Sequence, residues 1–396
     1  MKILTLSTYP IATPRHGGQH RLHNIVAAYR AAGHETQSVG VLGSITYEKE
    51  SGFVACPAHD ALAPYIEKPL YMEDWAIGQL AARGDDFFAA LCSQIHETPD
   101  LIHVEQPWLF EFARRYAGEI SGKAVKLLYG SANIEYLLKN KIVESCIDKR
   151  QAKLCAQLVL ECELAAARGA DIVCAASAHD ADWLRQQAGC EVVIAANGVR
   201  DRPTTNTGIN LANLITGQRK SVVYCASPHP PNIAGFFDMF GRGVGCLSPD
   251  ERLVVAGGAG SHIKADARFQ RVPGLGKHYI EAGEVTEECL QGLLHNAHAI
   301  ILPITLGGGT NLKTAEALWA GRHVVATQVA MRGFEKYTAS YGVAVCEGSV
   351  AFRHAVRAAM ASAPLELTHE ERLLRRSLLW ESTLMPLISS VSNSAP

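Results

Sequence analysis

Short apolar runs alternate with amphipathic helical stretches along most of this chain, and this alternation restricts its possible folds more than any other feature. Lys2–Ser7 is an apolar run, residues 9–18 are rich in turn formers, and helical periodicity covers residues 19–32. Residues 36–42 are the next apolar run. A strand, a glycine turn, a helix and a second strand make one right-handed parallel crossover. The pattern therefore favours an α/β fold with helices packed on a parallel sheet.

The same alternation occurs in two series. Strands are predicted in the first series at Leu101–Glu105, 126–129, 171–175 and 192–196, and in the second at 222–225, Arg252–Ala256, 280–283, 299–303 and His323–Thr327. Residues 202–216, between the two series, lack periodicity and predict a linker.

A chain of 396 residues is too long for one ordinary core. We therefore expect an α/β protein with two Rossmann-like, doubly wound domains, residues 1–205 and residues 206–368. Residues 369–396 are expected to end the chain with a helix over residues 370–387.

Charge and cysteine content exclude several classes of protein. The 37 basic and 39 acidic residues give a net charge of −2, which argues against binding nucleic acid by bulk charge. The 11 cysteines form no CxxC pair and are interpreted as reduced thiols. The apolar start is too short for a signal peptide, and no window approaches the roughly 18 apolar residues of a membrane span. We expect a cytoplasmic protein without a nucleic-acid partner or transmembrane segment, with any membrane contact peripheral and at the inner face.

The strongest chemical signal is the stretch 300–321, IILPITLGGGTNLKTAEALWAG. A predicted strand runs into Gly307, Gly308 and Gly309, and a helix begins after Thr310 and Asn311. Glycines allow a ligand to approach the backbone closely, and the first turn of a helix has unpaired N–H groups and partial positive charge. The combination predicts a site for phosphate at the end of a parallel strand.

Two charged residues lie on one face of that helix. Lys313 and Glu316 are three positions apart, so Lys313 can neutralise a pyrophosphate while Glu316 accepts hydrogen bonds from two ribose hydroxyls. The alternative interpretation is a glycine-rich turn followed by an ordinary surface ion pair.

This segment resembles the donor-site motif of the GT-B glycosyltransferases, in the branch called glycosyl transferases group 1. Members read roughly G-G-G-T-x-L-K-x-x-E-A-x-A-x-G, and this chain reads GGGTNLKTAEALWAG. The resemblance implies that Gly308, Gly309, Thr310 and Lys313 lie near the diphosphate of a sugar nucleotide, with Glu316 at the ribose. It also implies a donor substrate rather than a cofactor, and no metal. It further implies that residues 1–205 form the acceptor-side domain and residues 206–368 the nucleotide-sugar domain, facing each other across a cleft, with the C-terminal helix within residues 369–396 crossing back to the first domain.

Other segments resemble the family in the same order along the chain. Gly17 and Gly18 resemble the glycine loop that approaches donor phosphates and acceptor. The segment from Ser227 to Asn232 resembles the first loop of the nucleotide domain. Gly283 and Val285 resemble the segment whose backbone meets the base. Asn197-Gly198-Val199 resembles the turn before the linker, so the match spans nearly the whole chain.

Three departures from the family pattern affect the expected chemistry. Many retaining members have two glutamates eight positions apart, and the first of them falls on Gly308 here. The histidine of an N-domain motif is replaced by Ala132, whereas Asn133 and Glu135 remain. Ser227 and its neighbours stand where Arg and Lys are common, so phosphate neutralisation falls to Lys313, Arg15, Arg21 or backbone dipoles.

Carboxylates and rings near strand ends are candidates for the chemistry. Glu105 ends a predicted strand and is either a base for the acceptor hydroxyl or a structural carboxylate. Glu135 is either a base or a structural residue that caps a helix or forms a salt bridge. His103 shares a strand face with Glu105, but a metal pair there is not favoured. The catalytic candidates are Glu105, Asn133 and Glu135, and the acceptor-side candidates are His16, His20 and Trp108.

The favoured function is a metal-independent, retaining glycosyltransferase that moves a sugar from a nucleoside diphosphate sugar to a glycan or glycolipid. Two alternatives stay open. One is a sugar-nucleotide epimerase of the same fold. The other is a catalytically idle chain that binds a nucleotide or a partner, which the missing histidine and glutamate would permit.

Overall fold

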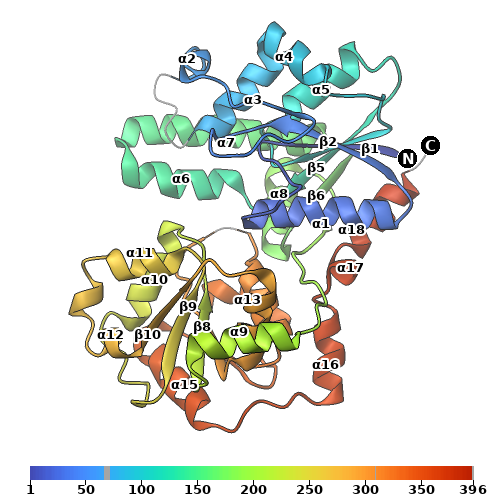
Figure 1. Ribbon diagram of the computed structural model, residues 1–396. Helices are drawn as coiled ribbons and strands as arrows, with labels where there is room; N and C mark the ends of the chain where they lie inside the picture. Colours follow the sequence, from blue (N-terminus) through green and yellow to red (C-terminus); the bar gives the residue numbers. More distant parts are fainter. Residues whose placement is uncertain (67–71, 308, 395–396) are drawn as a thin grey trace. The chain divides into compact units, whose positions relative to one another are not determined.

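The computed structural model describes residues 1–66, 72–307 and 309–394, with only the backbone of Ser145 and Cys146 (Figure 1). The chain divides into two compact units, each with its own parallel sheet. Unit 1 comprises Met1–Ala196 and Thr383–Pro396, and unit 2 comprises Asn197–Ser382. The fold class predicted from the sequence, α/β with two doubly wound sheets, is confirmed.

Unit 1 is built on a seven-stranded parallel sheet with the order β3-β2-β1-β4-β5-β6-β7. Its elements are β1 (Lys2–Ser7), α1 (Gly17–Ala31), β2 (Glu35–Val41), β3 (Phe53–Val54), α2 (His59–Leu62), α3 (Glu73–Arg83), α4 (Asp85–Cys92), β4 (Leu101–Glu105), α5 (Phe110–Glu119), β5 (Lys126–Ser131), α6 (Glu135–Cys146), α7 (Lys149–Gly169), β6 (Ile172–Ala175), α8 (Ala178–Ala188), β7 (Val192–Ile194) and α18 (Met385–Asn393).

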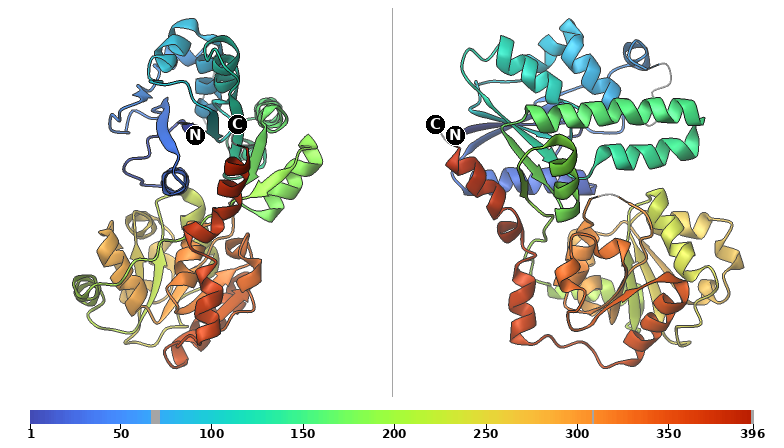
Figure 2. Two further views of the ribbon diagram at one scale, coloured as in Figure 1. Left: turned by 90° about the vertical axis from the view of Figure 1, so that its right-hand side faces the viewer. Right: turned by 180° about the vertical axis from the view of Figure 1, so that it is seen from behind.

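Alternation along the strands of unit 1 separates an apolar face from a partly polar one. Leu4, Leu6, Ile102 and Val104 belong to one large buried cluster with helices α3, α4, α5 and α7. The intervening positions face α1 and include charged groups that are described below. Both chain ends belong to this unit (Figure 2), where the Lys126 Nζ donates to the Ser394 carbonyl over 2.5 Å.

Unit 2 is built on a six-stranded parallel sheet with the order β10-β9-β8-β11-β12-β13. Its elements are α9 (Asn206–Thr216), β8 (Ser221–Cys225), α10 (Pro230–Phe240), β9 (Arg252–Ala256), α11 (Ala259–Ala265), η1 (Phe269–Arg271), α12 (Leu275–His278), β10 (Tyr279–Gly283), α13 (Glu287–Asn296), β11 (Ala299–Leu302), α14 (Leu312–Trp319), β12 (His323–Thr327), η2 (Val329–Met331), η3 (Glu335–Tyr337), β13 (Val343–Cys346), α15 (Gly348–Ala361) and α16 (His369–Arg376). A short helix, α17 (Trp380–Thr383), follows α16.

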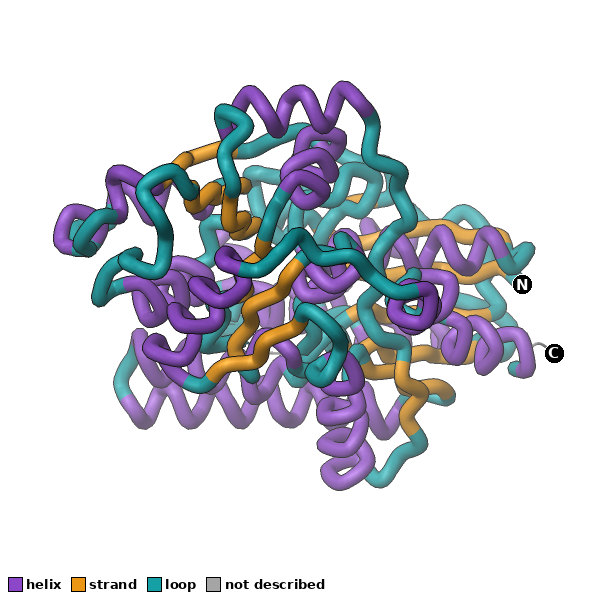
Figure 3. The backbone as a smooth tube through the Cα atoms, turned by 90° about the horizontal axis from the view of Figure 1, so that it is seen from below, coloured by secondary structure: helices purple, strands orange, loops and turns teal. Residues whose placement is uncertain are grey.

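Successive residues of the strands in unit 2 enter different cores, as the period of two requires. Val222 and Tyr224 pack in one cluster with α10, α11 and α15, whereas Val223 packs in the other with α13 and α14. Both faces of this sheet are therefore covered, and its strands are nearly uniformly apolar. The tube in Figure 3 shows helices on either side of the strands.

Two local predictions are wrong. Residues 206–216 are the helix α9 rather than linker, because Thr205 caps its start by accepting from the Gly208 N–H over 3.0 Å and Ala212 packs in the core. The C-terminal helix expected within residues 369–396 is instead α16, α17 and α18. The domain limits at 205 and 368 differ from the unit limits above and stay predictions. Among the described residues, no helix is long and apolar enough to cross a membrane.

Candidate functional site

Each sheet has a point where the strand order reverses. In unit 2 the chain runs from β8 outward to β10 and then returns to β11 on the other side of β8. In unit 1 the corresponding neighbours are β1 and β4. Crevices past the carboxyl ends of strands at such points are where open α/β sheets bind ligands. Most of the predicted site residues follow these four strands or β5.

The glycine loop of unit 2 joins β11 to α14. Gly307 has φ 150° and Gly309 has φ 58°, which side chains other than glycine rarely adopt. Arg332 holds both: its Nε donates to the Gly309 carbonyl over 2.7 Å and its Nη1 to the Gly307 carbonyl over 2.9 Å. Gly308 lies outside the described residues. The arginine clamp fixes the loop on each side of that position.

Unsatisfied polar groups gather where α14 begins. Asn311 is the N-cap residue but its side chain makes no cap hydrogen bond. The Thr310 carbonyl accepts from the Asn197 Nδ2 over 3.1 Å. The Thr310 Oγ1 and Asn311 Nδ2 are buried and have no hydrogen-bond partner among the described residues. With the unpaired N–H groups of the first helical turn, these atoms suit a polar, anionic ligand.

Lys313 is held beside the loop that follows β8. Its Nζ donates to the Asn232 Oδ1 over 2.9 Å, and the Asn232 Nδ2 donates to the Ser227 carbonyl over 3.0 Å. Burial lowers the pKa of Lys313 to about 8, against the opposing effect of Cys225 and Glu316. The structure thus brings together three residues that the sequence predicted separately. An anion here would be neutralised by an ammonium that burial has partly stripped of water.

Glu316 lies one turn further along α14. Burial, with a contribution from Glu287, raises its pKa to about 7, while Lys313 and Arg202 oppose that rise. Near neutral pH the carboxyl is therefore present in both protonation states. Either state can accept hydrogen bonds from sugar hydroxyls, and the ionised state does so more strongly.

Gly283 ends β10, the edge strand of the sheet, and Val285 lies in the loop that follows. Gly283 has φ 68° and its carbonyl accepts from the Gly257 N–H over 2.6 Å, whereas Val285 packs half-buried against the core. Within the described part of the chain, no hydrogen bond links them to Lys313. They remain predicted contacts for the base.

The glycine pair of unit 1 starts a helix rather than forming an open loop. Gly17 and Gly18 are the first residues of α1, and His16 is its N-cap. A Cβ on Gly18 would lie 3.0 Å from the Tyr9 hydroxyl, which explains the glycine. The His16 Nε2 lies 3.0 Å from the Tyr47 hydroxyl, and burial together with nearby His20 lowers the pKa of His16. The two histidines that the sequence predicts on the acceptor side are therefore neighbours.

Glu105 is enclosed in a buried polar network. Its Oε1 accepts from the Arg21 Nε over 2.8 Å, and its Oε2 lies 3.0 Å from the His103 Nε2. The side chain has 0% exposed surface. Burial would raise the pKa of Glu105, but Arg21 and His103 together hold it below its usual value. Both oxygens are occupied, which favours the structural role of Glu105 over that of a base, and Arg21 is bonded to Glu105.

The expectation that Trp108 lies on the acceptor side is also wrong. It is 2% exposed and packs in the apolar core of unit 1, with the Lys139 Nζ 5.6 Å from its ring centroid. A ring so enclosed cannot stack on an acceptor sugar. Trp108 is a core residue.

Glu135 is the first residue of α6, at the end of β5. Its Oε1 accepts from the Gln106 Nε2 over 2.7 Å and from the Asn133 Nδ2 over 3.2 Å. Burial raises its pKa to about 7; Lys139 opposes this rise and Asp74 adds to it. Glu135 can therefore take up or release a proton at neutral pH, which Glu105 cannot.

A second buried carboxyl group, that of Glu163, caps the start of α6. Glu163, on α7, accepts the backbone N–H groups of Glu135 and Tyr136, each over 3.0 Å, and the Tyr129 hydroxyl over 3.1 Å. Burial raises the pKa of Glu163 to about 8. Glu163 does the capping that the sequence offered as an alternative role for Glu135.

Sequence reasoning missed several groups around Glu135. Asp74, on α3, lies 3.3 Å from the Lys139 Nζ and accepts from the Thr8 hydroxyl over 3.2 Å. The hydroxyl of Tyr9 is buried and has no hydrogen-bond partner in the described part of the chain; burial, then Glu105 and Glu135, raise its pKa. Asp74 comes from a segment without a recognisable pattern, so only the fold could place it beside Lys139.

The described residues contain no group of three or more His, Cys, Asp or Glu side chains arranged to hold a metal ion. His103 and Glu105, on one strand face as predicted, bond to each other instead.

The sequence of unit 2 matches a known family. Residues 219–362 match the model of the family Glycosyl transferases group 1. This stretch contains the glycine loop, Lys313, Glu316, Ser227 and Asn232. The resemblance inferred from the sequence is confirmed there. No curated protein matches the sequence.

Solved structures of GT-B enzymes match both units. Sucrose-phosphate synthase from Thermosynechococcus elongatus is 15% identical, with TM-score 0.69 and coverage of 99% of this chain and 98% of that one. Anabaena HepE in complex with UDP and glucose is 15% identical, with TM-score 0.66 and coverage of 99% and 100%. The catalytic domain of starch synthase IV from Arabidopsis thaliana, bound to ADP and acarbose, is 11% identical, with TM-score 0.64 and coverage of 99% and 98%. At these identities the likeness establishes the GT-B fold.

Proposed function

We propose that this chain, with its GT-B fold and its group 1 glycosyl transferase segment, is a glycosyltransferase that uses a nucleoside diphosphate sugar. The observation that carries the proposal is the start of α14. There a clamped glycine loop, unsatisfied polar atoms and a buried lysine that Asn232 holds in place lie together. Similar folds have been solved with UDP, UDP-glucose or ADP, which supports a nucleotide donor.

In the proposed reaction the bond between the sugar C1 and the diphosphate breaks as the acceptor oxygen bonds to C1. The N-terminus of α14 and Lys313 stabilise the negative charge that develops on the diphosphate. Glu316 accepts hydrogen bonds from the ribose. We propose retention of configuration, in which the acceptor proton passes to the leaving phosphate. Asn133 and Glu135 then bind sugar hydroxyls, and the mixed protonation of Glu135 lets it hold or take up a proton there.

The finer parts of the proposal follow the family resemblance. The acceptor is a glycan or glycolipid in polysaccharide biosynthesis, and His16 and His20 lie on its side. Catalysis uses no metal or cofactor. The protein works in the cytoplasm, with peripheral contact to the inner face of the membrane.

The proposal is tested by calorimetric titration of UDP, GDP and ADP into the full chain. One nucleotide should bind, and Lys313→Met should weaken it about 10- to 150-fold, since a hydrogen bond to a charged group contributes about 1.5–3 kcal/mol. Lys277→Ala, an exposed lysine of the same unit, is the control and should leave binding unchanged. Equal affinity in Lys313→Met and wild type would contradict the donor site.

A catalytically idle nucleotide binder is the second candidate, because alanine stands at position 132 and glycine at position 308, where the family has histidine and glutamate. Slow hydrolysis of the matching nucleotide sugar separates the two. A transferase should hydrolyse its donor, and Glu135→Gln should slow that reaction. Tight nucleotide binding without any donor hydrolysis or transfer would favour the idle binder.

A further inference from the structure

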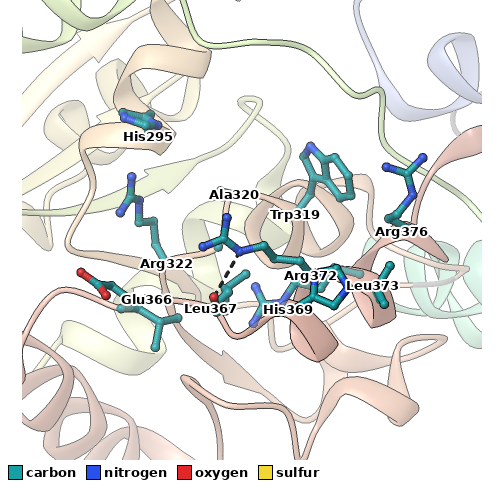
Figure 4. A pocket seen from close by; sticks show the side chains of 13 residues that line it. His295, Trp319, Ala320, Arg322, Glu366, Leu367, His369, Arg372, Leu373 and Arg376 are labelled. Atoms are coloured by element: carbon teal, nitrogen blue, oxygen red, sulfur yellow. Dashed lines mark hydrogen bonds between the residues drawn. The ribbon is translucent and has the colours of Figure 1, made fainter.

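A cavity of about 800 Å³ lies in unit 2 at the end of α14 opposite to the glycine loop (Figure 4). Its wall includes Trp319, the last residue of α14, Arg322 just beyond that helix, His295 of α13, and eight residues between Leu365 and Arg376. Volumes of roughly 300–1,000 Å³ are typical of sites for small molecules. None of the residues assigned to the donor site lines this cavity.

The wall carries a strong excess of positive charge. Its charged residues are four arginines and a single glutamate, namely Arg322, Arg372, Arg375, Arg376 and Glu366. His295 and His369 also line it. Burial and nearby Arg322 lower the pKa of His295, as expected where cations already crowd a space.

One of these arginines has a structural role. Arg375 is 1% exposed and donates from Nη1 to the Leu318 carbonyl, in the last turn of α14, and from Nη2 to the Tyr341 carbonyl over 3.2 Å. A cation there offsets the partial negative charge of a helix C-terminus. Stabilising the C-terminal end of α14 explains Arg375, but it does not explain the other three arginines.

Arg322 and Arg372 have N–H groups without a hydrogen-bond acceptor among the described residues. The Arg322 Nε is buried and has no hydrogen-bond partner among the described residues. Arg372 is exposed and uses its Nε for the Leu367 carbonyl, over 3.1 Å, which is the dashed line in Figure 4. A buried guanidinium N–H without an acceptor is costly, and arginine forks match phosphate oxygens well.

Apolar groups complete the wall. Trp319 and the leucines at 365, 367 and 373 line the same cavity. A wall that combines guanidinium groups with an indole ring and leucines fits a small molecule with one phosphate and one ring better than a free inorganic ion. We propose that this cavity is a second ligand site, for a small phosphomonoester whose phosphate binds Arg322 and Arg372 and whose ring packs on Trp319.

Calorimetric titration of glucose 6-phosphate into the full chain tests the site, with glucose as the uncharged control. We expect a dissociation constant of about 1 mM or lower for the phosphate ester and no binding of glucose. Arg372→Gln, a substitution at an exposed position, should weaken binding about tenfold or more, and adding Arg322→Gln should weaken it further. Arg219→Gln, an exposed arginine elsewhere in unit 2, should change nothing.

The donor site provides an independent readout. Lys313→Met should keep glucose 6-phosphate binding, and both arginine variants should keep the nucleotide affinity of wild type, which shows that they are folded. Failure of the proposed transferase function would therefore leave this proposal standing. Competition between glucose 6-phosphate and the nucleotide, or equal affinity of the arginine variants, would overturn it. So would arginine-dependent sedimentation with phosphatidylglycerol vesicles without binding of the dissolved ester, since the phosphate source would then be a lipid headgroup.

Discussion

The contrast between two glutamates of unit 1 gives the sharpest prediction. Glu105→Gln removes the carboxylate charge that faces the fully buried Arg21, where the two side chains are 2.8 Å apart. Breaking one side of a buried ion pair typically costs about 3–5 kcal/mol. For a domain of this size, about 2–4 °C are lost per kcal/mol, so the unfolding of unit 1 should shift down by roughly 6–20 °C.

Glu135→Gln is the matched change. Glu135 is equally buried, but its pKa of about 7 means that it is partly neutral already, and a glutamine oxygen can still accept from Gln106 and Asn133. We expect its melting temperature to stay close to wild type, within about 1 kcal/mol of stability. Its turnover should fall instead.

The assay is thermal unfolding followed by circular dichroism, beside nucleotide titration and donor hydrolysis at low temperature. Glu105→Gln should keep the nucleotide affinity of wild type, because the donor groups belong to unit 2. The reasoning is refuted if Glu105→Gln has the melting temperature of wild type while its turnover rate falls strongly. Glu105 would then be the base.

Three further predictions concern the same two sheets. Gly130→Ala would put a Cβ 2.3 Å from the Glu105 Oε2 and should lower the melting temperature. The control, Gly118→Ala, changes an exposed position of α5 with open space around it, and should be neutral or stabilise by about 0.5–1 kcal/mol. Glu163 keeps its proton to about pH 8 in the folded protein but loses it near pH 4.5 when unfolded, so the free energy of unfolding should fall as pH rises from about 5 to 8. In thermal unfolding measured across this pH range, Glu163→Gln should remove up to about 1.4 kcal/mol per pH unit of this dependence. An unchanged pH dependence in the variant would count against the raised pKa. Arg332→Met frees the carbonyls of the glycine loop and should weaken nucleotide binding about tenfold by calorimetry, with unaltered binding showing that the loop is held without it.

The sequence predicted the parallel architecture because strand periodicity is local. Lys2–Ser7, Leu101–Glu105 and Arg252–Ala256 are strands with the predicted bounds. Residues 202–216 contain Pro, Thr, Asn and Gly with little periodicity, and this composition predicts a linker. The helix α9 depends on the Thr205 cap and on packing against α13, which lies far along the chain.

Much of the proposed donor site can be predicted from the sequence, because the glycines, Lys313 and Glu316 lie within one strand–loop–helix unit. The clamp by Arg332 was not, because that residue comes from beyond the next strand and reaches back to the loop. Sequence separation hides a contact of this kind, whereas a short motif keeps its residues together.

Sequence alone determined the residue types and the strand ends on which carboxylates stand. It could not decide which carboxylate is available for chemistry. Glu105 and Glu135 each follow or end a strand, but only the tertiary structure sets Arg21 and His103 against one and leaves amide donors around the other. Protonation depends on burial and on charges within a few ångströms, and those neighbours come from α1, α3 and α6, which only folding brings to the same edge of the sheet.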